Sequence, residues 1–466
     1  MNSGEWLAGD VATEFDGSEL GDPRRERRLG KIASKLGDDP GASFPDVFST
    51  GAELEGFYRF LRNDSFDWTD VLKPHVEATC ARAEELGECL AIHDTTNFIF
   101  KGERDGLGPT SSKAQGFIGH LSLLVGMDDA RTPLGVGAID QYVRAGRKGR
   151  RSVGERLDDK TSEGQRWLKG AEAINKLAKD RFECIHVADR EGDTFPFLSG
   201  MLEFGGRFVI RVAQNRRVLD EDEELTRLHE VVLGLKAESS FDITVSKRGK
   251  RLNPTQAKSH PSREGRNVTV SIAGTSVCVA VPVARRKAME IEMNLVRVWE
   301  ENPDPNEPSV EWILWTTEPT GTIKQLRRVV EIYRARWVIE EYFKALKTGC
   351  QFERRQLESF DTLSTALALF APVAWKLLLA RSVVRSIPDS PPDRVISRAQ
   401  VAYLEGKYKK PLHTARDALY AMAKLGGHLS QNGEPGWLTL GRGYEKLATG
   451  EAFYQEMIRL NICDQS

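Results

Sequence analysis

The sequence predicts an α/β protein with an antiparallel sheet module set inside it and helical regions at both ends. One observation is a series of short apolar runs, typical of buried strands, separated by a helical stretch at 163–178. Another is the alternation of apolar and polar residues over 215–320. The last is a helical pattern from 323 onward. The strands predicted in the first part are 89–93, 120–127, 134–143, 184–188 and 207–213, with a hairpin turn at DDAR (128–131).

The bulk composition narrows the class of protein. A chain of 466 residues is long enough for about two to four domains with sizeable cores. Its net charge of −2 argues against a uniformly basic nucleic-acid binder. The six cysteines are scattered without a CxxC pair, which argues against a zinc cluster and against a disulfide framework. We find no apolar run long enough to span a bilayer and no signal-peptide pattern, so we expect a soluble, cytoplasmic protein without membrane contact.

Residues 1–75 are predicted to be helical and cationic. Within 24–35 there are six basic side chains and one acid, and further basic runs occur at 144–151 and 247–251. Local basic patches of this kind are what a phosphate backbone needs. The alternative, that a given patch is only a solvated surface, stays open for any single patch.

Two short stretches repeat one pattern, a buried-type strand that ends in an aspartate. They are ECLAIHD at 88–94 and ECIHVAD at 183–189, which end in Asp94 and Asp189. The carboxyl ends of central strands are where α/β sheets place their ligands. Both carboxylates are therefore candidate site residues; the alternative is that each only caps its strand or begins a turn.

The stretch YRARWVIEEYFKALKTG at 333–349 predicts one continuous helix, because it contains no Pro and its only Gly comes at the end. Apolar residues form an ordinary core stripe on one face. Pairs of Glu and Lys could explain the charges of the other face as a solvated surface. Large aromatics on that face argue against this, because they are poor residues to leave in water. The unusual face consists of Tyr333, Arg336, Trp337, Glu340, Lys344 and Lys347.

The carboxylates of Asp94, Asp189 and Glu340 would repel one another at one site unless cations lay among them. Oxygen ligands suit Mg²⁺, and two such ions about 4 Å apart activate a water in phosphodiester chemistry. The side chains around Glu340 fit the same substrate, since cations hold phosphates and flat rings accept an unstacked base. The cations are Arg336 and Lys347, and the rings are Trp337 and Tyr333. This pattern predicts a metal-dependent active site for nucleic acid.

The same residues carry a family resemblance. Their spacing, Y-x2-R-x3-E-x6-K, resembles the signature of DDE transposases of the insertion-sequence-four family, in particular its Tn-five-like members. HDTT at 93–96 and DREGD at 189–193 are similar to that family's two catalytic-aspartate motifs. GDPRRERRL at 21–29 and YRFLRN at 58–63 resemble its end-binding region. Gly192 in DREGD departs from the Tn-five-like pattern, which has a bulkier residue there.

The resemblance implies an RNase H-like mixed sheet with flanking helices, interrupted by a β-rich insertion. It also implies a division of the chain. The expected regions are a helical end-DNA-binding region at 1–75, the first part of the core at 76–214, the β-rich insertion at 215–320, the helix of the catalytic Glu at 321–370, and a helical dimerisation region at 371–466.

The resemblance also implies roles for individual side chains. Two Mg²⁺ ions, replaceable by Mn²⁺, would be bound at Asp94, Asp189 and Glu340. Trp312 would receive a base flipped out of the duplex, and Arg211 would touch the DNA backbone. Tyr333, Arg336 and Lys347 would hold the non-transferred strand near its 5′ phosphate. The resemblance of the N-terminal stretches adds Arg24, Arg25, Arg28, Tyr58, Arg59 and Arg62 as expected DNA contacts. Trp337 is expected to contact DNA because of its flat ring on the cationic helix face.

The function implied is that of a cut-and-paste DNA transposase. It would bind the inverted repeats at transposon ends as a homodimer, cleave them through a hairpin intermediate, and join the 3′-OH ends to target DNA. Its place would be the bacterial cytoplasm, at the nucleoid when DNA is bound. Two alternatives remain open, a metal nuclease without strand transfer and a catalytically inactive inhibitor of transposition. A two-carboxylate glycosidase finds no support in the basic patches and the cationic helix face.

Overall fold

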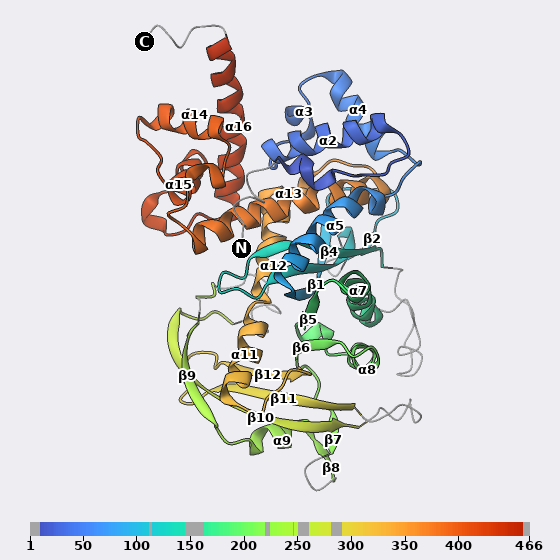
Figure 1. The fold of residues 1–466 in the computed structure, drawn as a ribbon, viewed down its shortest axis with the longest axis vertical. Helices are drawn as coiled ribbons and strands as arrows, with labels where there is room; N and C mark the ends of the chain where they lie inside the picture. The colour runs from blue at the N-terminus through green and yellow to red at the C-terminus, as the bar shows by residue number, and fades with distance from the viewer. Residues whose placement is uncertain are drawn as a thin grey trace. The chain divides into compact units, whose positions relative to one another are not determined.

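The computed structural model describes residues 10–110, 114–144, 163–219, 224–245, 247–249, 261–280 and 291–459 (Figure 1). The chain divides into two compact units. Unit 1 consists of Met1–Gly149, Lys176–Glu183 and Trp337–Ser466, and unit 2 consists of Arg150–Asn175 and Cys184–Arg336. Of the basic runs, 144–151 lies outside the described residues beyond its first position, and 247–251 is described only at 247–249.

The first part of unit 1 is helical because its sequence is amphipathic and well capped. In α2 (Pro23–Asp38) the Asp22 side chain accepts a hydrogen bond from the Arg24 N–H, and Pro23 occupies the first turn. Apolar residues repeat at helical spacing on the buried face, which leaves the other face to arginine and lysine. These buried residues are Leu29, Ile32, Ala33 and Leu36. The other elements here are η1 (Val11–Phe15), α3 (Phe44–Val47), α4 (Gly51–Leu61) and α5 (Trp68–Leu86).

The sheet of unit 1 is antiparallel. Its strands are β1 (Glu88–Phe100), β2 (Gly108–Pro109), β3 (Gln115–Gly126) and β4 (Pro133–Tyr142). β3 pairs with β1 along their full lengths, from Cys89 opposite Gly126 to Phe100 opposite Gln115. β3 also pairs with β2 and with β4, so the hairpin predicted at DDAR is present.

The C-terminal part of unit 1 contains a helix that corrects one expectation. α13 (Phe360–Ser386) has 27 residues and is long and apolar enough to cross a bilayer by length and composition alone. However, 94% of its most apolar stretch is buried inside the structure, so core packing accounts for its composition. The other elements are α12 (Trp337–Lys344), the π-helical turn η4 (Ala345–Gly349), η5 (Phe352–Arg354), η6 (Pro392–Arg394), α14 (Arg398–Tyr408), α15 (Ala415–Leu425), η7 (Ser430–Asn432) and α16 (Trp437–Arg459).

A buried polar network ties η1 to α5 and to the sheet of unit 1. The Glu14 carboxylate accepts hydrogen bonds from Nδ1 of His75 at 2.6 Å and from Nη1 of Arg82 at 2.9 Å. The Val136 N–H donates to Nε2 of His75, so the ring is neutral and carries its proton on Nδ1. Burial alone would raise the pKa of Glu14, but the His75 and Arg82 partners outweigh it and lower the pKa to about 2.

Unit 2 is built on a mixed sheet. β5 (Glu183–Ala188), whose first residue belongs to unit 1, runs parallel to β6 (Arg207–Arg211), and the remaining pairs are antiparallel. The order is β5-β6-β12-β11-β10-β7-β8, with β9 paired to β10, so the strands after residue 215 extend the sheet that contains β6. The further strands are β7 (Arg217–Leu219), β8 (Leu225–Arg227), β9 (Ser239–Val245), β10 (Arg266–Val279), β11 (Ile291–Glu300) and β12 (Glu311–Thr316).

Helices pack on this sheet through a core of large apolar side chains. Trp167, Phe197 and Trp315 are among its members, and all three are almost fully buried. The helical elements of unit 2 are α7 (Glu163–Ala178, in this unit up to Asn175), η2 (Arg190–Gly192), α8 (Phe195–Glu203), α9 (Leu228–Gly234) and α11 (Ile323–Arg334).

Candidate functional site

Asp94 lies in the middle of β1, not at the end of a strand, which corrects the expectation from the sequence. The strand continues because the residues after Asp94 are mostly β-branched or aromatic and pair with β3 throughout. What changes at Asp94 is burial, since Cys89–His93 are buried and the next four residues are only partly so. The Thr95 N–H donates to Asp94 Oδ1 at 2.8 Å. Asp94 is thus the first acidic side chain beyond the buried half of its strand.

The continuous helix expected at 333–349 is interrupted. α11 ends before Ala335 and α12 begins after Arg336, whose N–H donates to the Tyr333 carbonyl at 3.0 Å. Such an i to i−3 bond tightens the last turn of a helix. No Pro or Gly marks this position, so no local stop signal predicts it. The two units also divide here, so Tyr333 and Arg336 belong to unit 2 while Glu340 and Lys347 belong to unit 1.

Glu340 lies in the first turn of α12 and is partly exposed, where the helix dipole favours a carboxylate. Lys347, on η4, is mostly buried against β1. Its Nζ donates to the Asn97 carbonyl at 2.5 Å and lies 3.5 Å from a Glu353 carboxylate oxygen. Burial lowers the pKa of Lys347. Lys347 therefore links η4 to the strand that carries Asp94.

Trp337 is 51% exposed at the start of α12. The Lys344 ammonium lies 5.1 Å from the centre of its ring and 2.7 Å from a Glu341 oxygen. A cation–π contact at an exposed site contributes about 0.5–1 kcal/mol. The two contacts of Lys344 are compatible with a solvated face as well as with a DNA contact.

Asp189 directly follows β5 and remains partly exposed. Its Oδ1 accepts the Glu191 N–H at 2.8 Å and so caps η2. Gly192, in the same turn, is required by packing, because a Cβ there would lie 2.6 Å from the Ala188 Cβ and 3.2 Å from the Trp167 ring. The departure from the Tn-five-like pattern at Gly192 therefore accompanies a close approach of Trp167.

Asp193, the second acid of DREGD, is a residue that the sequence analysis missed. It is 1% exposed, and its Oδ2 accepts the N–H groups of Ala213 at 2.7 Å and Gln214 at 2.9 Å. Its Oδ1 forms an ion pair with Arg216 at 2.7 Å. These bonds fasten the turn after β5 to the segment after β6. The local sequence signal that could have identified Asp193 was its place as the last acid of DREGD.

Arg190 directly follows Asp189 in unit 2, and Arg211 lies near Arg190. Burial and the nearby charge of Arg211 lower the pKa of Arg190, while Tyr333 and Asp189 oppose this effect. Arg211, at the end of β6, donates from Nη2 to the Glu311 carbonyl at 3.0 Å. Two neighbouring guanidinium groups that repel each other are suited to an anionic ligand such as a phosphate.

Two of the expected DNA-stacking rings contact each other in unit 2. The centroids of Trp312, on β12, and Tyr333, on α11, are 5.9 Å apart with their planes at 59°. Tyr333 is buried, with 6% exposure, and Trp312 is half-buried. Arg336 is partly exposed in the turn after α11. The partly open ring of Trp312 is therefore a better platform for a base than Tyr333.

A cationic groove of ≈ 570 Å³ lies between α2 and α4 in unit 1. Five cations of α2, spaced i, i+3, i+4, i+7 and i+11, line one side of it. The acid in its lining, Glu53, is paired with one of them at 3.0 Å. Phe48 and Phe57 also line the groove. The cations are Arg24, Arg27, Arg28, Lys31 and Lys35, of which only the first and third were expected individually to contact DNA.

Arg25 does not line this groove. Its Nη1 donates to the Leu20 carbonyl at 3.0 Å and its Nη2 to Ser65 Oγ at 3.1 Å. Helical spacing places residue 25 on a different face of α2 from the cations that line the groove.

The expected contacts on and after α4 are distributed differently from those on α2. Arg59 is exposed and lies 3.5 Å from a Glu55 oxygen. Arg62 lies 3.8 Å from a Glu358 oxygen and 5.8 Å from the centre of the half-buried Tyr58 ring. None of these three residues is among those that line the groove.

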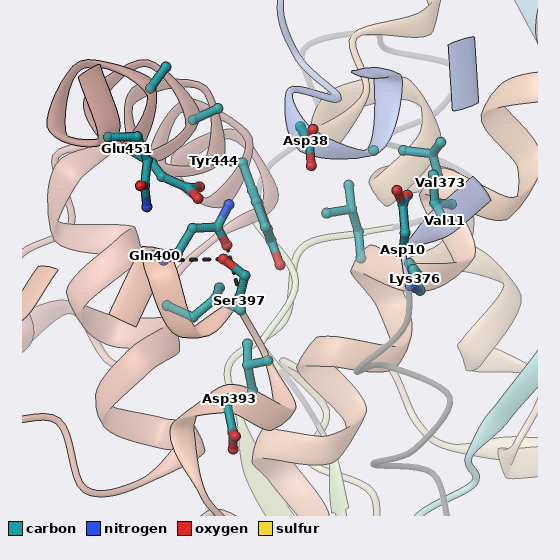
Figure 2. Close-up of a pocket in the computed structure, with 17 residues that line it drawn as sticks. Asp10, Val11, Asp38, Val373, Lys376, Asp393, Ser397, Gln400, Tyr444 and Glu451 are labelled. Atoms are coloured by element: carbon teal, nitrogen blue, oxygen red, sulfur yellow. Dashed lines mark hydrogen bonds between the residues drawn. The ribbon is translucent and has the colours of Figure 1, made fainter. Parts of the chain in front are cut away.

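A second cavity in unit 1, of ≈ 530 Å³, has the opposite charge (Figure 2). Its lining includes the carboxylates of Asp10, of Asp38 on α2, of Asp393 on η6 and of Glu451 on α16. Among the described residues that line it, Lys376 is the one cation. Burial, together with Asp10 and Glu451, raises the pKa of Asp38 to about 6. Four carboxylates would repel phosphates, so this cavity does not suit a DNA backbone.

Two sequence-family models match separate parts of the chain. Residues 8–66 match the family described as transposase DNA-binding, and residues 160–372 match the transposase DDE domain. The chain carries a transposase DNA-binding domain and a DDE transposase domain. The cationic groove lies in the first match, and Asp189 and Glu340 lie in the second, which begins after Asp94.

Among solved structures, the chain is similar to the piggyBac transposase in a synaptic complex with hairpin DNA. The likeness covers 97% of this chain and 78% of that one, at 11% identity and a TM-score of 0.37. A TM-score this low carries no argument about fold or function.

DDE transposase domains generally use divalent metal ions. Among the described residues, no group of three or more His, Cys, Asp or Glu side chains is gathered in a way that could hold one. Asp94 and Glu340 belong to unit 1 and Asp189 to unit 2, so neither unit alone contains all three carboxylates. The donors themselves are partly exposed carboxylate oxygens, which suit a hard divalent cation.

Proposed function

We propose that this chain is a cut-and-paste DNA transposase with an RNase H-like catalytic core. The observation that supports this most is that each family match contains side chains suited to its role. The DNA-binding match contains the cationic groove, and the DDE match contains the carboxylates of Asp189 and Glu340 with Arg190 and Arg211.

The metal ligands in this proposal are Asp94, Asp189 and Glu340. They would hold two Mg²⁺ ions, for which Mn²⁺ can substitute. When bound, these ions supply an activated water and stabilise the leaving oxygen of the cut phosphodiester.

The remaining residues bind and orient DNA. The α2 groove holds the backbone of the transposon end, and Arg190 and Arg211 hold a phosphate next to Asp189. Trp312 stacks on a base that is extruded when the cut end forms a hairpin. The hairpin is then opened, the 3′-OH is joined to target DNA, and a homodimer brings two ends together in the bacterial cytoplasm.

The test uses the purified chain and DNA that carries the inverted repeats flanking its gene. We expect nicking, hairpin formation and joining in Mg²⁺ or Mn²⁺. Asp94→Ala, Asp189→Ala and Glu340→Ala should each abolish cleavage and leave binding of end DNA within a few-fold. A wild-type chain that binds ends without cutting them would support the inactive inhibitor, and cutting without joining would support the plain nuclease.

A further inference from the structure

The residue next to Glu340 is held by three donors from three parts of unit 1. Glu341 is 9% exposed, and its Oε1 lies 2.7 Å from the Lys344 Nζ. Its Oε2 accepts hydrogen bonds from Arg381 Nη1 at 3.0 Å and from the indole Nε1 of Trp437 at 2.9 Å. Arg381 lies on α13 and Trp437 is the first residue of α16, so one carboxylate joins α12 to both helices.

The donors to Glu341 are themselves held in place. Arg381 Nη2 lies 3.3 Å from Glu434 Oε2, and the same carboxylate oxygen pairs with Arg385 at 2.7 Å. The Arg381 guanidinium also lies 4.9 Å from the centre of the Trp437 ring. The network therefore has little freedom to follow α12 if that helix moves.

The anchor at Glu341 adds to the directional contact that Lys347, on the η4 turn that continues α12, makes with the Asn97 carbonyl. α12 has eight residues, begins after the break at Arg336, and ends in a π-helical turn. Its apolar side is buried, but apolar contacts are non-directional. The Tyr342 hydroxyl adds one long hydrogen bond, to the Ala371 carbonyl at 3.3 Å.

Rotation of α12 would act directly on Glu340. Successive helical residues are about 100° apart, so restraining Glu341 restrains the direction in which Glu340 projects. A helix with its side chains is about 10–12 Å across, so a rotation of roughly 20° moves a surface carboxylate by about 2 Å. Displacements of about 1 Å in a catalytic group already cost about a hundredfold in rate.

We propose that Glu341 is a positioning residue that aims the Glu340 carboxylate at its metal, and that α13 and α16 set this aim through Arg381 and Trp437. The proposal rests on the proposed function, because it takes Glu340 as a metal ligand. A purely stabilising role is a weaker explanation, because a buried ion pair often contributes little more stability than apolar residues of the same size.

The first experiment maps metal binding without catalysis. Fe²⁺ with ascorbate and peroxide cleaves a polypeptide backbone near the bound ion, and we expect cuts near Asp94, Asp189 and Glu340 in the full-length wild type. In Glu341→Gln, the Fe²⁺ concentration needed for the cut near Glu340 should rise about tenfold, as when a group that orients a metal ligand is removed. The matched control is Glu14→Gln, which also neutralises a buried carboxylate held by an arginine but lies away from α12; it should keep the wild-type pattern.

A milder pair of variants keeps the test decisive if Glu341→Gln folds poorly. Trp437→Phe removes one indole N–H and keeps a ring. Trp375→Phe removes the corresponding buried N–H from a tryptophan that donates to the Pro133 carbonyl at 2.9 Å. The Mg²⁺ concentration for half-maximal nicking should rise severalfold in Trp437→Phe but not in Trp375→Phe, with end-DNA affinity unchanged in both.

The outcomes separate the two proposals. If the wild type is cut by Fe²⁺ and nicks DNA, but Glu341→Gln and Trp437→Phe match their controls at equal loss of melting temperature, Glu341 is only structural and the inference is overturned. If the wild type neither nicks end DNA nor is cut by Fe²⁺ near Glu340, the proposed function fails, and the positioning role fails with it.

Discussion

Units 1 and 2 present their polar site residues in different ways. In unit 1, the Lys347 ammonium beside β1 donates a hydrogen bond to the Asn97 carbonyl and forms an ion pair with Glu353. In unit 2, burial and the nearby charge of Arg211 lower the pKa of Arg190. The first arrangement uses charge to hold its own elements together, whereas the second brings two cations near each other, as the proposed phosphate contact requires. The two units therefore use their cationic side chains in different ways.

The largest expected effect tests whether the carboxylates of the two units serve one site. Asp94→Ala in unit 1 and Asp189→Ala in unit 2 should each lower the nicking rate by about 10³-fold or more, because residues that act as a unit lose function together. The double variant should be no slower than either single variant. Single-turnover nicking of labelled end DNA measures all three, and multiplicative losses would mean that the two residues act independently.

We expect Asp193→Ala to lower the stability of unit 2 and not that of unit 1. Removing this carboxylate leaves Arg216 buried without its partner and orphans two backbone N–H groups, which should cost about 3–5 kcal/mol. Hydrogen exchange should rise at 189–193 and 213–216, while β1 and β3 stay protected. Asp242→Ala, which removes an exposed carboxylate of the same unit, is the control. Equal exchange in the two variants would contradict a central role for Asp193.

The corresponding stability test of unit 1 is acid unfolding. Glu14 titrates near 4.5 in the unfolded chain and near 2 in the native state, so its stabilisation is fully present above pH 4.5 and is lost as the pH falls toward 2. The shift corresponds to about 3 kcal/mol at neutral pH. Urea unfolding between pH 2 and 7, monitored by hydrogen exchange of the amides of α5, should show this loss of stability. In Glu14→Gln that part of the pH dependence should disappear.

Trp312 tests whether the aromatic pair of unit 2 serves DNA or only packing. Stacking of a base is worth roughly 1–3 kcal/mol, so Trp312→Ala should slow hairpin formation by about ten- to a hundredfold and leave the first nick nearly intact. Denaturing gels resolve the two products. Trp315→Phe, in the core of the same strand, should instead lower the melting temperature and change both products alike. The same behaviour in Trp312→Ala would make Trp312 a core residue.

The smallest effect concerns the cationic groove of unit 1. Arg24→Ala and Arg28→Ala should each reduce the log–log salt slope of end-DNA binding by about one. Arg25→Ala is the matched control on the same helix, because its side chain is engaged with Leu20 and Ser65 away from the groove. Fluorescence anisotropy over a salt series measures the slopes. A drop with Arg25→Ala but not with Arg24→Ala would move the DNA to another face of α2.

The sequence by itself determined the features that depend on local periodicity. The apolar stripe of α2 fixes which face its arginines occupy. The apolar runs before Asp94 and Asp189 form β1 and β5, because a short run of apolar residues is buried most readily as a strand. Asp189 was correctly expected directly after its strand for the same reason.

Tertiary structure alone decided the features that depend on partners distant in sequence. β1 continues past Asp94 because β3 supplies hydrogen bonds along its whole length. α11 ends without a Gly or Pro, although helix propensity favours continuing. The burial of Asp193 depends on Arg216 and on backbone N–H groups about 20 residues away. Each outcome rests on contacts between segments that no local pattern brings together.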